Sequence, residues 1–345
     1  MSGDSSTNSV YLIHKSVEYF VIGGFPFTLG DMIRYNKLET CHVGSTQSSK
    51  LAVYVEGIGL VLNIGTLYLI SRQGLGSPDM YLALILAVCD ICLVISKLGV
   101  YTYYASTSDF SIFSSVWFGQ LDGLVMCLLI STSVLCIGYL AVLRCWAIFL
   151  KRKISNKLWL GVFLVQQSIV LLFLVATANS HEFKLAPFGR YFYPDPTSSN
   201  FFTCASILMF SSWVLFSIVS VNVAYPVICY TYILQINTAA LCLYWRPCAI
   251  AQFHLKQKIA VILRILLLMI IYDLVMVPAF FIITKEFLQH RLRSVAQDSF
   301  LSFCLLGLVI VNPLTLIFLH QDIFNDVKSI IASLFPSSVS HQYPN

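Results

Sequence analysis

The sequence predicts an all-α protein: a seven-transmembrane helix bundle followed by a short amphipathic C-terminal helix. The first observation is composition, since 58% of the 345 residues are hydrophobic and 11% are charged, against about 25% charged residues in an average soluble domain. The mean hydropathy is +0.80. The second observation is that seven apolar runs approach or exceed the roughly 20 residues that a helix needs to cross a bilayer. We therefore expect one membrane bundle rather than several soluble domains.

The seven runs follow one another along most of the chain, separated by polar breaks. They are long and rich in Leu, whereas a transmembrane β-barrel would show short alternating segments, so helices are favoured. The predicted spans lie near 51–72, 80–104, 119–150, 158–178, 206–235, 257–283 and 297–319.

The segment before the first span, 1–50, contains "VEYFVIGGFPFTLGD", which Gly23, Gly24 and Pro26 interrupt. It is too short and too broken to cross a membrane. Because it lacks a basic leader and a clear cleavage site, we do not expect a signal peptide. We predict an extracellular arm over 1–50 and the bundle over 51–319.

The stretch after the last span, "HQDIFNDVKSIIASLF", has an amphipathic pattern. Helical periodicity brings its apolar residues to one face, which predicts a helix lying on the membrane surface. We assign 320–345 to this helix and a short cytoplasmic tail. The residues of the apolar face are Ile323, Phe324, Val327, Ile330 and Ile331.

Lys and Arg in the short loops predict the orientation. With the N-terminus outside, the inner loops include the dense run "KRKISNK" at 151–157, and the outer loops carry fewer basic residues. We expect a multi-pass protein of the plasma membrane with its C-terminus inside and lipid around its spans. These loops account for the net charge of +5, and nothing in the sequence indicates binding to nucleic acid.

Polar residues within apolar spans are costly and are therefore functional candidates. They can also hydrogen-bond one another and only fix helix packing. The candidates are Asn63, Asp90, Ser133, Arg144 and Asn312, with further acids at Glu56, Asp122 and Asp273.

In their order and separation these residues resemble the pattern of the rhodopsin-like (class A) G-protein-coupled receptors, across all seven spans. Asp90 and Arg144 are 54 positions apart, and Pro278 and Pro313 are 35 apart, both close to the usual spacing of that family. The positions that carry the resemblance are Asn63, Leu86, Ala87, Asp90, Arg144, Pro226, Pro278 and Pro313.

The chain departs from the family pattern at its switch positions. Leu143 stands where an acid normally precedes the third-helix Arg, and Cys145 replaces the Tyr that follows it. Lys258 stands near the place of the sixth-helix acid that often bonds this Arg. The family's seventh-helix Asn-Pro-x-x-Tyr ends here in Leu316. Arg144 should therefore lack a resting salt bridge, which predicts high basal activity if the protein couples to G proteins.

The resemblance implies roles for the polar and proline positions. Arg144 and Cys145 would meet a heterotrimeric G protein, and the three span prolines, Pro226, Pro278 and Pro313, would be helix pivots. A polar centre would bind a sodium ion, although Leu308 replaces a further polar ligand of that site. The polar centre is Asn63, Asp90, Ser133 and Asn312.

The resemblance also bears on the ligand. Met126 stands at the place of the amine-binding Asp, and Leu306 at the place of the retinal-binding Lys. A biogenic amine and retinal are therefore not expected. We predict a mainly apolar pocket that takes an apolar small molecule or a peptide from outside. The candidate pocket residues are Met126, Cys127, Met276 and Phe280.

Cys41 and Cys204 are the only two of the eleven cysteines in predicted outer regions. The family's usual third-helix Cys is missing at the top of that helix, because Cys127 lies too deep. One hypothesis is that Cys41 and Cys204 pair in the oxidising exterior, and the other is that both are free thiols.

Two alternatives stay open, and a third is not expected. A transporter or channel could use Glu56, Asp90 and Asp273 as an ion or proton path, although no inverted repeat is evident. A receptor-like protein could have lost G-protein coupling with its switch residues. An enzyme is not expected, because no His-Glu-x-x-His or Gly-x-Ser-x-Gly motif is present.

Overall fold

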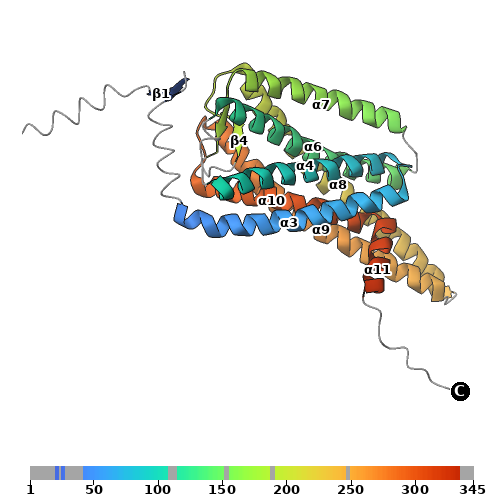
Figure 1. The fold of residues 1–345 in the computed structure, drawn as a ribbon. Helices are drawn as coiled ribbons and strands as arrows, with labels where there is room; N and C mark the ends of the chain where they lie inside the picture. Colours follow the sequence, from blue (N-terminus) through green and yellow to red (C-terminus); the bar gives the residue numbers. More distant parts are fainter. Residues whose placement is uncertain are drawn as a thin grey trace, which may run out of the picture.

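The computed structural model describes residues 20–22, 25–27, 42–107, 115–150, 155–186, 191–245 and 249–334. Within these residues, seven helices are long and apolar enough to cross a membrane, and they lie side by side in one bundle (Figure 1). The predicted fold class, a seven-helix transmembrane bundle, is confirmed. The seven helices are α3 (His42–Gln73), α4 (Pro78–Thr107), α6 (Val116–Leu150), α7 (Asn156–Asn179), α8 (Phe201–Trp245), α9 (Ala249–Leu288) and α10 (Val295–Leu319).

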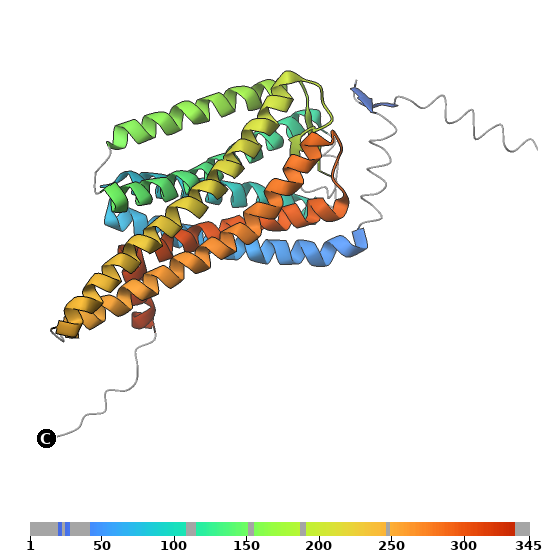
Figure 2. The same ribbon diagram turned by 180° about the vertical axis from the view of Figure 1, so that it is seen from behind.

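The helices extend beyond the predicted spans at several ends. α3 begins at His42 rather than near 51, and α8 continues to Trp245 rather than ending near 235. Figure 2 shows α8 and α9 running together past the rest of the bundle at one end. The apolar runs predict the membrane-crossing part of a helix, and polar helical turns that continue outside it lie beyond what hydropathy detects.

α6 is the central helix of the bundle. Every residue from 130 to 141 is buried, and α6 packs against α4, α7 and α8. α7, in contrast, exposes large apolar side chains such as Leu158, Val165 and Leu172. In a chain that crosses the bilayer these side chains face lipid, so α7 is a peripheral helix.

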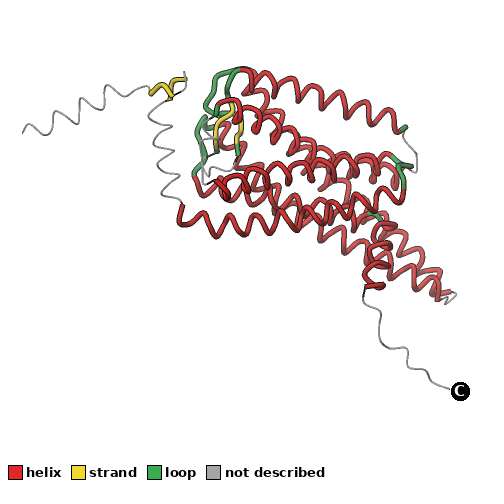
Figure 3. The backbone as a smooth tube through the Cα atoms, viewed as in Figure 1, coloured by secondary structure: helices red, strands yellow, loops and turns green. Residues whose placement is uncertain are grey.

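A short antiparallel hairpin lies across one end of the bundle (Figure 3). It pairs β3 (Phe183–Leu185) with β4 (Phe192–Pro194), with Phe183 opposite Pro194. A second hairpin pairs β1 (Phe20–Ile22) with β2 (Phe25–Phe27) within the predicted N-terminal arm. The β3–β4 hairpin packs against α6 and forms the roof of the cavity described below.

Two glycines of α6 let the β3–β4 hairpin approach the helix closely. A Cβ atom built on Gly119 would lie 2.5 Å from Cε1 of Phe192. A Cβ atom on Gly123, one helical turn further along, would overlap Cδ1 of Phe183. Because any larger side chain would collide with a phenylalanine ring, these two positions fix the hairpin on α6.

The C-terminal helix, α11 (Gln321–Leu334), lies at the opposite end of the bundle from the β3–β4 hairpin and at a steep angle to the long helices (Figure 1). Ile323 is fully buried against the bundle, whereas Ile330 is exposed. The predicted amphipathic helix is present, with part of its apolar face docked on the protein and part open.

Candidate functional site

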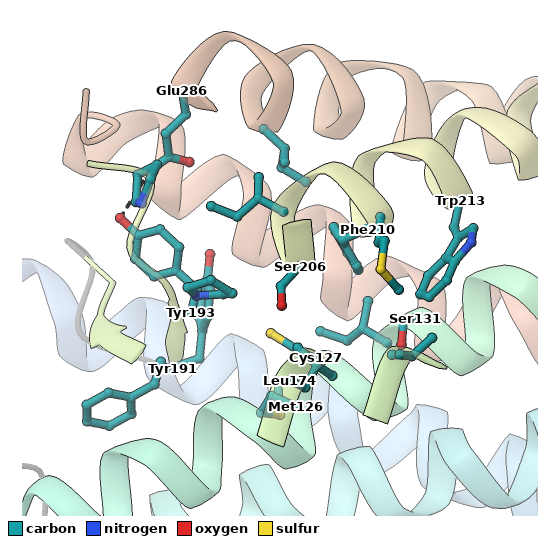
Figure 4. Close-up of a pocket in the computed structure, with 18 of the residues that line it drawn as sticks. Met126, Cys127, Ser131, Leu174, Tyr191, Tyr193, Ser206, Phe210, Trp213 and Glu286 are labelled. Carbon is teal, nitrogen blue, oxygen red and sulfur yellow. Dashed lines mark hydrogen bonds between the residues drawn. The ribbon is translucent and has the colours of Figure 1, made fainter. Parts of the chain in front are cut away.

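A cavity of about 850 Å³, its open mouth included, lies beneath the β3–β4 hairpin between α6, α7, α8, α9 and α10. Figure 4 shows Tyr193 and Glu286 at one end of the cavity and Trp213 at the other. Of the predicted pocket residues, Met126 and Cys127 line it. Met276 is instead buried in the core and Phe280 packs against that core, and neither lines this cavity or the smaller one beside it.

The walls of this cavity are predominantly apolar. They consist of aliphatic, aromatic and sulfur-containing side chains from five helices. The main apolar lining residues are Met126, Ile130, Val170, Phe173, Leu174, Ile207, Met209, Phe210, Trp213 and Leu305. Two wall serines are bonded elsewhere: Ser131 donates to the Leu128 carbonyl at 2.9 Å, and Ser206 bonds Thr177 at 3.0 Å.

The polar end of the cavity is a buried cluster centred on Arg293, in the loop between α9 and α10. Arg293 Nη1 donates to Glu286 Oε2 at 2.7 Å, and Nε donates to Asp298 Oδ1 at 2.7 Å. Nη2 donates to the Tyr191 hydroxyl at 2.8 Å. The hydroxyls of Tyr191 and Tyr193 in turn donate to Asp298 at 2.7 Å and to Glu286 at 3.1 Å. The five residues, hereafter the roof cluster, join the hairpin to α9 and α10.

Burial and charge together set the protonation of the roof cluster. Burial raises the pKa of the Tyr191 and Tyr193 hydroxyls well above their ordinary values, so both remain neutral donors. Burial lowers the pKa of Arg293, but the neighbouring carboxylates of Glu286 and Asp298 act against it, and its pKa lies above the ordinary value. Arg293 therefore stays charged between two carboxylates, and it also stacks 4.1 Å from the centre of the Tyr193 ring.

α6 holds the other side of the hairpin. Gln120 makes two hydrogen bonds with the backbone of Phe183, donating to its carbonyl and accepting from its N–H, each at 3.0 Å. Asp122 accepts from the Phe192 N–H at 3.4 Å and lies 3.6 Å from Lys97 Nζ of α4. The roof is thus attached to α6, α9 and α10.

A second, smaller cavity adjoins the first between α3, α4, α6 and α10. Glu56, Lys97 and Ser302 line it among apolar side chains. The two cavities share Met126, Ile130, Tyr191 and Leu305, so these four side chains form the partition between them.

Three of the four predicted polar-centre residues meet between α4, α6 and α10. Ser133 donates to Asp90 Oδ1 at 3.0 Å, and Asn312 Nδ2 lies 2.8 Å from both Asp90 Oδ2 and the Ser133 hydroxyl. Asn63 instead donates to the Gly59 and Val309 carbonyls, each at 2.9 Å. Asn63 therefore joins α3 to α10 beside the centre, and sodium binding stays a prediction.

Arg144 lies near the C-terminal end of α6. Its Nη1 donates to the Tyr225 hydroxyl of α8 at 3.5 Å, and its Nη2 is buried with no hydrogen-bond partner among the described residues. Leu143 is buried in the core and Cys145 is half-buried. Arg144 forms no salt bridge with a carboxylate of the described residues, as expected from Leu143 and Lys258.

His320, at the end of α10, lies next to this region. Burial lowers the pKa of His320 to about 3, the Arg144 cation acts in the same direction, and Asp79 acts against both. His320 is therefore neutral at physiological pH, and its 3.7 Å approach to Asp79 does not join two full charges.

The remaining predicted positions have these surroundings. Pro226, Pro278 and Pro313 all lie inside helices, and Pro226 directly follows Tyr225, so it lies at the level of Arg144. Cys204 is a free thiol directed at the Ser198 carbonyl at 3.4 Å. Cys41 lies outside the described residues, so its pairing with Cys204 stays a prediction.

The roof cluster and Tyr225 are the features that sequence reasoning missed. The only available signals were an aromatic second outer loop and a basic residue in a short loop between two spans. Their meeting depends on how the hairpin folds over the bundle, which no local pattern encodes.

The chain has the fold of a rhodopsin-like membrane protein. Its structure is similar to the crystal structure of squid rhodopsin with a TM-score of 0.61 and 13% sequence identity, over 85% of this chain and 86% of that chain. No family model matches the sequence, and no curated protein does. At this identity the likeness shows the fold alone: a multi-pass, seven-helix membrane bundle.

Proposed function

We propose that the protein is a membrane receptor that transmits occupancy of its outer cavity to a heterotrimeric G protein at its inner end. Support comes from the rhodopsin fold together with three sites on one helix. α6 contributes Met126 and Ile130 to the cavity, Ser133 to the polar centre and Arg144 to the inner end. A ligand that binds two states of the bundle unequally shifts the equilibrium between them.

The observation that carries the proposal is the state of Arg144. The hydroxyl of Tyr225 accepts a hydrogen bond from the guanidinium of Arg144, and one of its nitrogens is buried without a hydrogen-bond partner among the described residues. A buried charged donor without an acceptor raises the free energy of the folded protein. An acceptor supplied by an incoming G protein would remove this cost. Since no carboxylate of the described residues pairs with Arg144, high basal coupling is expected.

Side-chain hydrogen bonds join α8 to α9, so that the inner halves of these two helices can move together. Ser217 bonds the Tyr272 hydroxyl at 2.5 Å, and Asn222 donates to Asp273 at 2.8 Å. Pro226 and Pro278 lie within these two helices, each near one of the bonds. We propose these prolines, with Pro313 of α10, as the points where the helices pivot.

Nucleotide exchange on purified G proteins tests the proposal. The receptor is reconstituted in vesicles with each class of heterotrimer, and Arg144→Ala is compared with Lys157→Ala, which removes an exposed basic residue at the start of α7. Arg144→Ala should reduce exchange at least tenfold and Lys157→Ala should not. Equal exchange by both variants would reject the role of Arg144, and no exchange by the wild type with any heterotrimer would reject coupling.

A second comparison tests the missing acid. Leu143→Asp places a carboxylate beside Arg144, and Leu143→Asn introduces similar polarity without charge at the same buried position. Basal exchange should fall more in Leu143→Asp than in Leu143→Asn. If the two fall equally, the charge of the residue beside Arg144 does not set basal activity.

The alternative of an ion path has less support in the geometry. Asp90 is bonded within the polar centre and Asp273 to Asn222, whereas Glu56 lines the smaller outer cavity, which neither of the other two acids lines. Ion flux in liposomes together with absent nucleotide exchange would nevertheless favour a transporter.

We further propose that the protein lies in the plasma membrane with its N-terminus outside. An antibody against a C-terminal tag should then bind only after the cells are permeabilised.

A further inference from the structure

We propose that the ligand of the outer cavity is an uncharged lipid that enters from the bilayer between α7 and α8. The effect of this lipid on signalling rests on the proposed function, but its binding to the cavity does not require coupling to a G protein. It narrows the class of ligand from any apolar small molecule or peptide to a membrane-dissolved molecule with a long hydrocarbon part.

The first argument is that the polar groups of the cavity wall are already used within the protein. The two wall serines bond Leu128 and Thr177. The carboxylate, guanidinium and two tyrosine hydroxyls of the roof cluster that line the cavity bond one another or Asp298. A charged ligand would lose its hydration without gaining a partner, whereas an apolar one displaces no hydrogen bond.

The second argument concerns the roof. Tyr191, Phe192 and Tyr193 are all buried over the cavity. The hairpin that carries them is attached to α6 by Gln120 and to α9 and α10 by Arg293. A water-soluble ligand arriving along the axis of the bundle would have to break these buried bonds, so the roof is a barrier on that side.

The third argument is that the wall between α7 and α8 is thin. Thr177 and Ser206 bond across it, so this side of α8 faces α7, and Met209 lies on the same side three residues later. Phe173 and Met209 line the cavity yet are only half-buried. Their neighbours Leu172 and Leu208 are 68% and 52% exposed, and in a membrane these side chains contact lipid.

The lining of the cavity also suits such a ligand, because apolar side chains from several helices follow one another along it. The long lining from Tyr193 to Trp213 (Figure 4) offers an extended hydrocarbon a continuous apolar surface.

Trp213 provides a direct reporter, because it lines the cavity and bromine quenches indole fluorescence on contact. The protein is reconstituted in dioleoylphosphatidylcholine vesicles that contain 9,10-dibromostearyl alcohol. Saturable quenching is expected at a low mole fraction of the alcohol and should disappear in Trp213→Phe. Unbrominated oleyl alcohol should compete and restore the fluorescence.

Matched variants test whether the cavity is the binding site, and matched probes test whether the ligand is uncharged. Leu174→Phe narrows the cavity wall and Leu172→Phe adds the same ring to the lipid-facing side of α7. The first should weaken binding at least tenfold and the second should leave it unchanged. The charged counterparts of the alcohol are 9,10-dibromostearic acid, studied at pH 9 so that it is ionised, and 9,10-dibromostearylamine. Each should bind at least tenfold more weakly than the alcohol.

The route is tested by dilution at fixed total alcohol. Added phosphatidylcholine should lower occupancy in proportion to the mole fraction of the alcohol in the bilayer.

Three results would overturn the inference. They are quenching that never saturates, quenching that Trp213→Phe retains, and stronger quenching by the charged probes than by the alcohol. Saturable binding with no effect on nucleotide exchange would leave the inference standing and count against the proposed function.

Discussion

Arg293 joins the β3–β4 hairpin to α9 and α10. It is buried with two carboxylates and two tyrosine hydroxyls. Its removal would leave Glu286 and Asp298 buried near one another without their shared cation. Breaking a buried ion pair in this way is far more destabilising than losing a surface pair.

We therefore predict that Arg293→Ala lowers the free energy of unfolding by about 3–5 kcal/mol. Unfolding of the purified protein by sodium dodecyl sulfate in mixed micelles would measure it. Arg291→Ala is the matched control, since Arg291 is an exposed arginine of the same loop. Similar losses in the two variants would show that the roof cluster adds little.

Asp195, which follows β4, gives the roof a pH dependence. Burial raises the pKa of Asp195, but hydrogen bonds from Lys184 and Thr197, at 2.8 and 2.7 Å, outweigh it and hold the pKa below its usual value. Because the folded pKa is the lower one, this carboxylate contributes stability that is fully present above the unfolded value of about 3.9 and is lost as the pH falls through the folded value.

The expected result is a pH-dependent effect of Asp195→Asn. The variant should melt at a lower temperature than the wild type at pH 6, and the difference should shrink as the pH falls below about 3.9 toward the lowered pKa of the wild-type carboxylate. Melting followed by tryptophan fluorescence in micelles provides the comparison. A difference that stays constant with pH would contradict this account of Asp195.

At the scale of elements, the fit between α6 and the β3–β4 hairpin decides whether the cavity is roofed. Gly119 and Gly123 lie on the face of α6 that meets Phe192 and Phe183. The sequence "WFGQLDGLV" contains both glycines, but their spacing of one helical turn acquires meaning only when the hairpin is known to lie against them.

Gly123→Ala should displace Phe183 and destabilise the fold by about 1–3 kcal/mol, the usual effect of overpacking. Unfolding in mixed micelles measures the change. Gly161→Ala is the control, because a Cβ atom at that position of α7 meets nothing within 4 Å. A Gly123→Ala protein as stable as Gly161→Ala would mean that the hairpin is not held in this position.

At the scale of the whole molecule, α11 contacts α9, the sixth helix of the bundle, at the end opposite the β3–β4 hairpin (Figure 1). The Arg264 guanidinium of α9 lies 3.6 Å from the centre of the Phe324 ring of α11. Any outward movement of α9 at this end would separate the two, so the contact favours the arrangement seen here.

A double-mutant cycle measures this link. Phe324→Leu combined with Arg264→Gln should show a coupling of about 0.5–2 kcal/mol in the free energy of unfolding, as expected for a cation–π pair. Phe324→Leu combined with Lys258→Gln, on the same helix, should show coupling near zero. Equal coupling in the two cycles would exclude a specific Arg264–Phe324 interaction.

The sequence by itself determined the number and approximate position of the membrane helices and the amphipathic last helix. Hydrocarbon thickness acts on each span separately, so hydropathy along the chain is sufficient to find it. It also singled out Asp90, Ser133 and Asn312, which the structure brings together, because polar residues stand out against apolar spans.

Only the tertiary structure decided which polar residues meet. Asn63 bonds the Val309 carbonyl rather than joining Asp90, and Met276 turns into the core rather than toward the cavity. In the roof cluster, Tyr191 bonds Arg293, 102 positions away, and Asp298, 107 positions away. Such contacts depend on how the helices cross and how the hairpin folds back over them, and those are properties of packing between segments rather than of any one segment.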